Sequence, residues 1–175
     1  MNTKTIATAG IFGALALIAT MIKVPMHFGN PNLGSTPVSV SGILFTPGVA
    51  FATGIIKGIG ASLWTGQPYI ELAAGLGDGL MALCTYKLAR MMQAERAIIL
   101  GQLSRYLFTS TLIAFSVSVM INGNIAMLPE VWVAIFPAVT LSIIANAMVS
   151  VLIIKGLGDR AKLMLGLGSE SELAI

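Results

Sequence analysis

Two short apolar segments, separated only by Thr46-Pro47-Gly48, constrain this chain more than any other feature. They cover residues 36–45 and 49–63, and each is shorter than the roughly 20 apolar residues of an ordinary membrane-spanning helix. Both are rich in glycine and alanine, which let helix backbones approach closely in lipid, where packing drives association. Because Pro47-Gly48 predicts a tight turn between them, we expect a dense helical bundle.

The composition sets the environment of that bundle. The 175 residues are 56% hydrophobic and only 10% charged, unlike an average soluble domain. We therefore expect an all-α integral membrane protein, a compact bundle of six transmembrane helices at about 5–22, 36–45, 49–63, 70–91, 97–121 and 131–154. Residues 1–162 are predicted to form a single domain, and 163–175 a cytoplasmic tail. The first helix is expected to be retained, because Lys23-Val24-Pro25 follows it instead of a cleavage site.

The basic residues indicate how the chain crosses the membrane. With six crossings, almost all of them fall on one side: Lys4, Lys87, Arg90, Arg96, Lys155, Arg160 and Lys162. Only Lys23 falls on the other side. Since cytoplasmic loops are enriched in Lys and Arg, both termini are predicted to be cytoplasmic in a multi-pass protein of the cell membrane. Basic residues grouped at helix ends are not typical of a nucleic-acid partner.

Three polar connections, 25–35, 64–69 and 122–132, are then predicted to meet at the outer face. Aromatic walls with a few polar groups are typical of a small-molecule site. The candidate substrate-binding residues are His27, Phe28, Asn30, Asn32, Lys57, Trp64, Gln67, Tyr69, Glu71, Asn122 and Asn124. Trp64 and Tyr69 allow two interpretations, an interfacial belt or a stacking wall for a planar ligand.

Polar residues within the apolar helices need partners or an aqueous cavity. We expect Lys57 and Asp78 to form a structural ion pair in preference to a direct ligand contact. Arg105 is predicted to lie near the cytoplasmic end of its helix and to extend toward lipid headgroups. Asn146 is predicted to make an interhelical hydrogen bond.

Several chemistries lack the residues they require. The chain has one histidine, His27, and one cysteine, Cys84, so it forms neither a disulfide nor a His/Cys metal cluster by itself. We expect no metal, no bound cofactor and no catalytic residues. The chain also lacks a G-x-x-x-x-G-K-[ST] phosphate-binding loop, so any ATP must be used by partner subunits.

The sequence around the two short segments resembles a known family. The run Leu33-Gly34-Ser35-Thr36-Pro37-Val38, the run from Ser41 to Gly48, and Gly54-Ile55-Ile56-Lys57 resemble the substrate-binding S components of energy-coupling factor (ECF) vitamin transporters. The likeness extends over most of the chain and is greatest to the riboflavin-type branch. Thr46 stands where glycine is usual, and Ser35-Thr36 where an acidic residue is common. The loop 23–35 also has some likeness to the biotin-type branch, so the substrate stays open.

The resemblance implies a subunit that captures a vitamin or related small molecule at the outer face for ATP-driven uptake. The implied partners are the ECF transmembrane coupling subunit and two ABC ATPases, and the bundle is implied to topple in the bilayer to release its cargo. Small residues form one face of the first helix: Ala9, Gly10, Gly13 and Ala14. Their spacing alone favours packing within the chain, whereas the resemblance implies contact with the coupling subunit.

Two other functions remain open. One is a membrane-embedded enzyme acting on a lipid or isoprenoid, which needs paired acids, a histidine base or metal ligands converging on one site. The sequence offers isolated charges on different helices instead. The other is a carrier that works without partner subunits.

Overall fold

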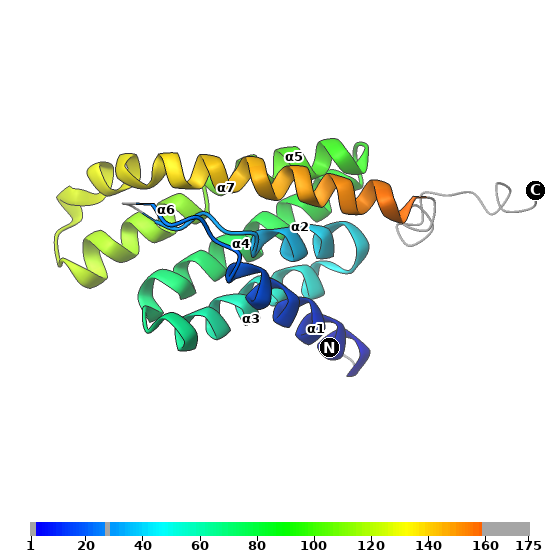
Figure 1. The fold of residues 1–175 in the computed structure, drawn as a ribbon, viewed down its shortest axis with the longest axis horizontal. Coiled ribbons are helices and arrows are strands. Elements are labelled where there is room, and N and C mark those ends of the chain that lie inside the picture. The colour runs from blue at the N-terminus through cyan, green and yellow to red at the C-terminus, as the bar shows by residue number, and fades with distance from the viewer. Residues whose placement is uncertain (1–2, 27–28, 159–175) are drawn as a thin grey trace, which may run out of the picture.

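The structure is a computed structural model that describes residues 3–26 and 29–158 (Figure 1). Its elements are α1 (Thr3–Thr20), α2 (Ser35–Leu44), α3 (Pro47–Thr65), α4 (Pro68–Ala89), α5 (Ala94–Leu103), η1 (Ser104–Tyr106), α6 (Thr109–Phe115), η2 (Ser116–Ile121), η3 (Ile125–Met127) and α7 (Leu128–Leu157). The prediction of an all-α protein is confirmed for the described residues. The predicted tail 163–175 lies outside them, as do Arg160 and Lys162.

The helices form six segments in the described part of the chain, because α5, η1, α6 and η2 together make one helical segment, Ala94–Ile121. Within residues 3–26 and 29–158, three of these segments are long and apolar enough to cross a membrane: Thr3–Thr20, Ala94–Ile121 and Ile125–Leu157. Of the others, α2 has only 10 residues, and α3 and α4 carry Lys57 and Asp78. Six crossings therefore remain a prediction.

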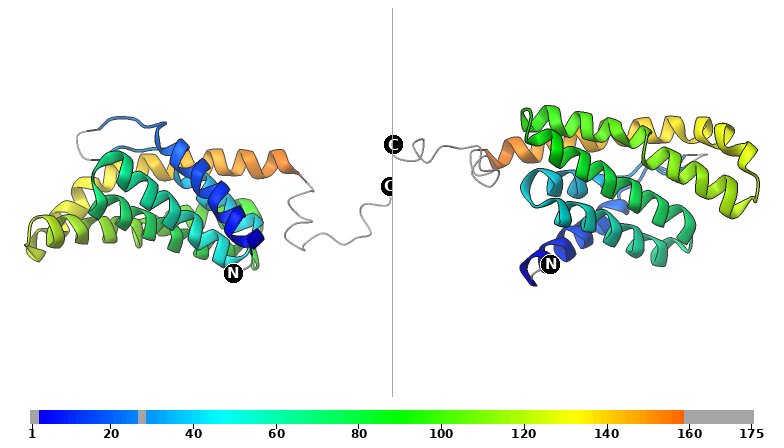
Figure 2. Two further views of the ribbon diagram at one scale, coloured as in Figure 1. Left: turned by 90° about the horizontal axis from the view of Figure 1, so that it is seen from below. Right: turned by 180° about the vertical axis from the view of Figure 1, so that it is seen from behind.

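The short helix α2 begins inside the bundle, where Ser35 is fully buried. The preceding loop folds back on itself. The Val24 amide donates to the Pro31 carbonyl at 2.9 Å, and the Leu33 amide donates to the Ile22 carbonyl at 3.3 Å. Figure 2 shows this loop leading from α1 toward the end of the bundle opposite the N-terminus. These hydrogen bonds bring the two ends of the loop together, so α2 starts beside the end of α1.

Glycines join α3 to α4 along a line of backbone contact, the glycine seam, formed by Gly54, Gly58, Gly75 and Gly79. A Cβ atom added at Gly58 would lie 2.8 Å from the Gly75 Cα, and one added at Gly54 would lie 2.4 Å from the Gly79 nitrogen. Neither distance leaves room for a side chain. The expectation that small residues bring backbones together is confirmed here, and the seam places Lys57 of α3 against Asp78 of α4.

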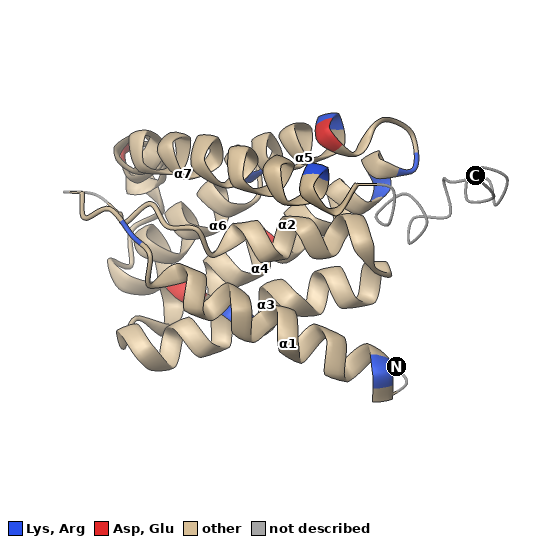
Figure 3. Cartoon of the chain, turned by 45° about the vertical axis from the view of Figure 1, so that its right-hand side comes forward, with Lys and Arg blue, Asp and Glu red and all other residues tan. Residues whose placement is uncertain are grey.

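One end of the bundle, called the apolar end below, is filled by a buried cluster of Val40, Ile43, Ala89, Ala97, Ile98 and Ile154. The chain's N-terminal helix begins and α7 finishes at this same end (Figure 1). Figure 3 shows basic residues gathered there. Lys4 lies in the first turn of α1 and Lys155 in the last turn of α7. This grouping is what the positive-inside pattern requires, and its orientation in the membrane remains a prediction.

Candidate functional site

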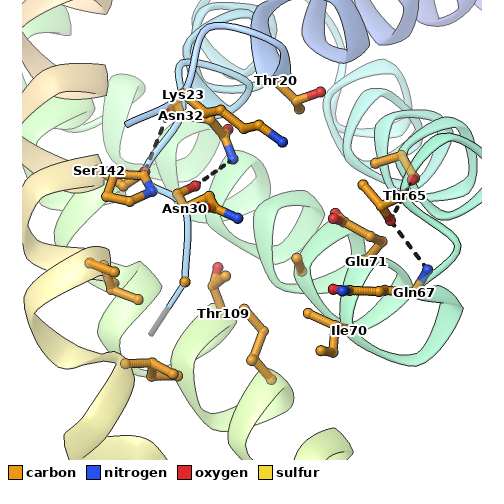
Figure 4. Close-up of a pocket in the computed structure, with 18 of the residues that line it drawn as sticks. Thr20, Lys23, Asn30, Asn32, Thr65, Gln67, Ile70, Glu71, Thr109 and Ser142 are labelled. Carbon is orange, nitrogen blue, oxygen red and sulfur yellow. Dashed lines mark hydrogen bonds between the residues drawn. The ribbon is translucent and has the colours of Figure 1, made fainter. Parts of the chain in front are cut away.

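A cavity of about 1040 Å³ lies at the other end of the bundle, lined by residues of 20–26 and 29–32, of α3, α4, η1, α6, η2 and α7, and by Gln67 and Asn122 (Figure 4). Its volume matches the upper range of pockets that hold small molecules. All three connections predicted for the outer face contribute residues to its walls, as expected if these loops meet around a ligand.

Most of the candidate binding residues lie in the wall of this cavity: Asn30, Asn32, Lys57, Trp64, Gln67, Glu71 and Asn122. Tyr69 and Asn124 have other places. The Tyr69 ring is half exposed, and its backbone oxygen accepts a hydrogen bond from Ser116 Oγ at 2.8 Å. Asn124 Oδ1 accepts from the Ala126 amide at 3.0 Å and caps η3. His27 and Phe28 lie outside the described residues. Substrate contact by any of these residues remains a prediction.

The two less buried sides of the cavity face each other with complementary polar groups. Figure 4 shows Glu71 and Gln67 on one side and Asn30 and Asn32 across from them. Asn32 is held by its own loop, since its Nδ2 donates to the Asn30 carbonyl at 3.2 Å and its Oδ1 accepts from the Gly34 amide at 2.9 Å. The Glu71 carboxylate makes no ion pair with any described residue. It is therefore available to a ligand.

A buried polar network centred on Asp78 forms the floor of the cavity. Asp78 Oδ2 accepts from Lys57 Nζ and from Ser35 Oγ at 2.7 Å. Asp78 Oδ1 accepts from Arg105 Nε at 3.1 Å and from Thr109 Oγ1 at 3.2 Å. Asp78 is fully buried, while Lys57 and Arg105 are 4% and 6% exposed and line the cavity. The cations thus face the cavity, and the carboxylate lies behind them.

The network continues from Arg105 into α7 and the loop. Arg105 Nη1 donates to Ser142 Oγ at 3.0 Å. The Asn32 carbonyl accepts from Asn146 Nδ2 at 2.7 Å and from Ser142 Oγ at 3.3 Å. Thr36 Oγ1 donates to Asn146 Oδ1 at 2.8 Å. These bonds fix the loop to α7 beside the cavity.

Three expectations about polar residues in the helices can now be compared with the structure. The Lys57–Asp78 ion pair and the interhelical hydrogen bonds of Asn146 are confirmed. The prediction for Arg105 was wrong. Its side chain is buried and paired with Asp78 instead of extending toward headgroups, because its helical segment begins at Ala94 and Arg105 lies 11 residues further on, roughly 16 Å along the axis.

Three residues of the floor, Arg105, Thr109 and Ser142, were not among the candidates. A signal for them exists in the sequence, because Arg105 and Thr109 are four residues apart, as are Ser142 and Asn146. Polar residues at this spacing lie on one face of a helix. In apolar helices, such a pair indicates a shared polar environment.

Apolar side chains complete the cavity on the side of α6, η2 and α7. They are Ile113, Val117, Val131, Ala134, Ile135, Ala138 and Val139. They bring no hydrogen-bonding groups, so this wall suits the apolar or aromatic body of a ligand.

The small face of α1 divides between two environments. Ala9 is buried, and a Cβ atom added at Gly13 would lie 2.5 Å from Ile56 of α3, so these two residues pack within the chain. Ala14 is exposed, and a Cβ atom added at Gly10 would meet nothing within 4 Å among the described atoms. Only Gly10 and Ala14 are open to a partner.

The carboxylate of Asp78 is fully used within the protein. Asp78 has both oxygens occupied by two hydrogen bonds each, which leaves it no free lone pair directed at a substrate. Among the described residues, no group of three His, Cys, Asp or Glu side chains is placed to hold a metal ion. What faces the cavity is a set of hydrogen-bond donors and acceptors around an apolar wall.

Comparison with known proteins supports the fold. No family model matches the chain, and no curated protein matches it. A solved structure, that of the S component of a bacterial ECF transporter, is similar with a TM-score of 0.71. The two sequences are 18% identical, and the match covers 93% of this chain and 99% of the other. The chain therefore has the fold of an ECF transporter S component.

Proposed function

We propose that this protein is the substrate-binding S component of an ECF-type ABC transporter. It captures a vitamin or related small molecule at the outer face for ATP-driven uptake, and works with a transmembrane coupling subunit and two ABC ATPases. Its helices cross the cell membrane six times with both termini in the cytoplasm. The sequence likeness favours the riboflavin-type branch and leaves the substrate open.

One observation carries this proposal: a cavity of about 1040 Å³, lined by amides, cations and apolar side chains, lies at the end of the bundle opposite the basic helix ends that carry Lys4 and Lys155. If basic ends face the cytoplasm, the cavity faces outward. The fold shared with an S component supports the same assignment. Because both oxygens of Asp78 already accept hydrogen bonds from the protein, this carboxylate gives no support to an enzyme.

The surface of α1 that faces away from the bundle is the one we propose for the coupling subunit. Gly10 and Ala14 lie on it, next to exposed Ile11 and Ile18. Small residues in an apolar helix surface let a partner helix approach closely. Gly13 contributes by holding α1 against Ile56 of α3, and Ala9 by packing within the bundle.

Binding by the purified chain tests the first half of the proposal. The full chain in lipid nanodiscs is examined by native mass spectrometry for a co-purified small molecule, then titrated with a panel of vitamins and related heterocycles. Saturable one-to-one binding is expected. Absence of both a co-purified molecule and any binding would refute the assignment.

Co-purification tests the second half. Gly10→Leu is compared with Gly156→Leu, because neither glycine has an atom within 4 Å of an added Cβ in the described structure. We expect Gly10→Leu to lose the coupling subunit and ATPases from the native membrane extract while ligand binding stays unchanged, and Gly156→Leu to retain them. Uptake by the chain expressed alone would instead show a carrier that needs no partners.

A further inference from the structure

The floor of the cavity has one positive charge more than its negative charges. Lys57 and Arg105 are both cationic, and the carboxylate of Asp78 is the only negative group paired with them among the described residues. The elements packed around them add neutral groups, the hydroxyls of Ser35 and Ser142. The less buried part of the cavity adds one positive charge, Lys23, and one negative charge, Glu71, so its net charge is zero. A buried excess charge is costly unless something neutralises it.

The guanidinium of Arg105 also has unused donors. Its Nε and Nη1 donate to Asp78 and Ser142, while its Nη2 makes no hydrogen bond to any described residue. The side chain is only 6% exposed and lines the cavity. Lys57 Nζ donates to Asp78 alone within the described structure, although an ammonium has three donors. Neither nitrogen is a buried atom without a partner, so the floor presents unused donors to the cavity and can bind an acceptor there.

That acceptor must come from outside the chain, since Asp78 already accepts four hydrogen bonds. We propose that the cavity selects its ligand by a terminal carboxylate, which Lys57 and Arg105 bind at the floor. The apolar wall of α6 and α7 covers the ligand's body. This inference rests on the proposed function and names the substrate class for that site.

Charge distinguishes a carboxylate from a phosphate ester. A carboxylate carries one negative charge and matches the excess of the floor. A phosphate monoester carries about −1.5 to −2 at neutral pH and would leave a buried negative excess. Guanidinium donors form strong charge-assisted bonds to either oxyanion, so the balance of charge decides.

Glu71 fixes the orientation of such a ligand. It lies on α4 seven residues before Asp78, roughly 10 Å along the helix axis. Its carboxylate repels a second acid and accepts from N–H donors. The ligand is therefore held with its carboxylate inward and a hydrogen-bond donor near Glu71 and Gln67.

Matched pairs of probes test this inference on the full chain in nanodiscs. The pairs are biotin with biotinamide, nicotinate with nicotinamide, and lipoate with lipoamide, and riboflavin with its 5′-phosphate forms the phosphate arm. For any pair that binds, we expect the acid to bind about 10- to 100-fold more tightly than the amide, as a charge-assisted hydrogen bond predicts. A co-purified molecule identified by mass spectrometry is expected to contain a carboxylate.

Variants show whether the floor is responsible. Arg105→Gln should reduce the acid-to-amide ratio toward one, and Arg105→Lys should retain part of it. Gln67→Ala, which removes a neutral side chain away from the floor, should weaken acid and amide equally. The ratio is measured within each variant, and the ratio in the unaltered protein remains decisive if Arg105→Gln does not fold.

The outcomes separate the two proposals. Equal binding of acid and amide, tighter binding of the phosphate, or a co-purified ligand without a carboxylate would overturn this inference and leave the proposed function intact. Failure to bind any small molecule would overturn the proposed function and this inference with it.

Discussion

At the apolar end, Ile43 and Ile98 fill the space between α2, α5 and α7, whereas at the opposite end the helices surround a cavity of about 1040 Å³. The polar network of Asp78 forms the floor of the cavity and holds residues of α2, α3, α4, η1 and α6 together. The difference shows how one small bundle separates two tasks. Buried apolar area at one end stabilises the fold, and uncovered surface at the other remains free for a ligand.

Removing the shared carboxylate should have the largest effect. Asp78→Asn leaves Lys57 and Arg105 buried side by side without their counter-ion. Breaking a buried ion pair by removing one partner costs about 3–5 kcal/mol, so we expect a large loss of stability in reversible unfolding in detergent. The double variant Lys57→Gln/Asp78→Asn, which removes one charge of each sign, should recover part of it. Wild-type stability in Asp78→Asn would show that the network is not structural.

Trimming the apolar end should lower stability without changing recognition. Ile43 is fully buried in the cluster at that end. Truncation to alanine leaves a cavity and costs about 2–4 kcal/mol, measured by the same unfolding assay. The affinity for a bound ligand should stay within twofold of the wild-type value. Leu152→Ala, at a site 65% exposed, is the control and should unfold like the wild type. A marked loss of affinity in Ile43→Ala would mean that the two ends are coupled.

Replacing a polar residue of the cavity wall should weaken binding and leave stability unchanged. The variant is Asn122→Ala, and its effect should be smaller than that of Ile43→Ala. Asn122 lines the cavity and is otherwise exposed. Losing one neutral hydrogen bond to a ligand weakens binding by about 2- to 10-fold, and the midpoint of unfolding without ligand should not move. Calorimetric titration measures the affinity. Asn124→Ala, a neighbour that caps η3, should leave the affinity unchanged.

The sequence predicted the apolar end better than the cavity end. Apolar composition and the Pro47-Gly48 turn are local signals, and the helices they indicate are present. Lys57 and Asp78 could be paired from sequence because a buried lysine needs an acid. The third member, Arg105, was misplaced because its depth depends on where its helical segment begins, which hydropathy alone fixes poorly.

A loop residue can contribute to the cavity only if it has a suitable side chain and that side chain also points into the cavity. Asn30 and Gln67 were predicted as binding residues because amides beside aromatics suggest a site, and both line the cavity. Tyr69 and Asn124 carry equally suitable groups, yet neither lies in the wall of the cavity, and Asn124 Oδ1 caps η3 instead. No pattern in the residues themselves distinguishes these cases, because the direction of a loop side chain follows from tertiary packing.

The glycine seam has a consequence for how this protein can change. Along Gly54, Gly58, Gly75 and Gly79, main chain meets main chain, so there are no side chains to shorten and no room to lengthen any. The spacing of α3 and α4 along the glycine seam is therefore fixed for as long as the two helices stay joined. A relative with an altered cargo must therefore acquire its new preference from the side chains that line the cavity and not from a change in the spacing of these two helices.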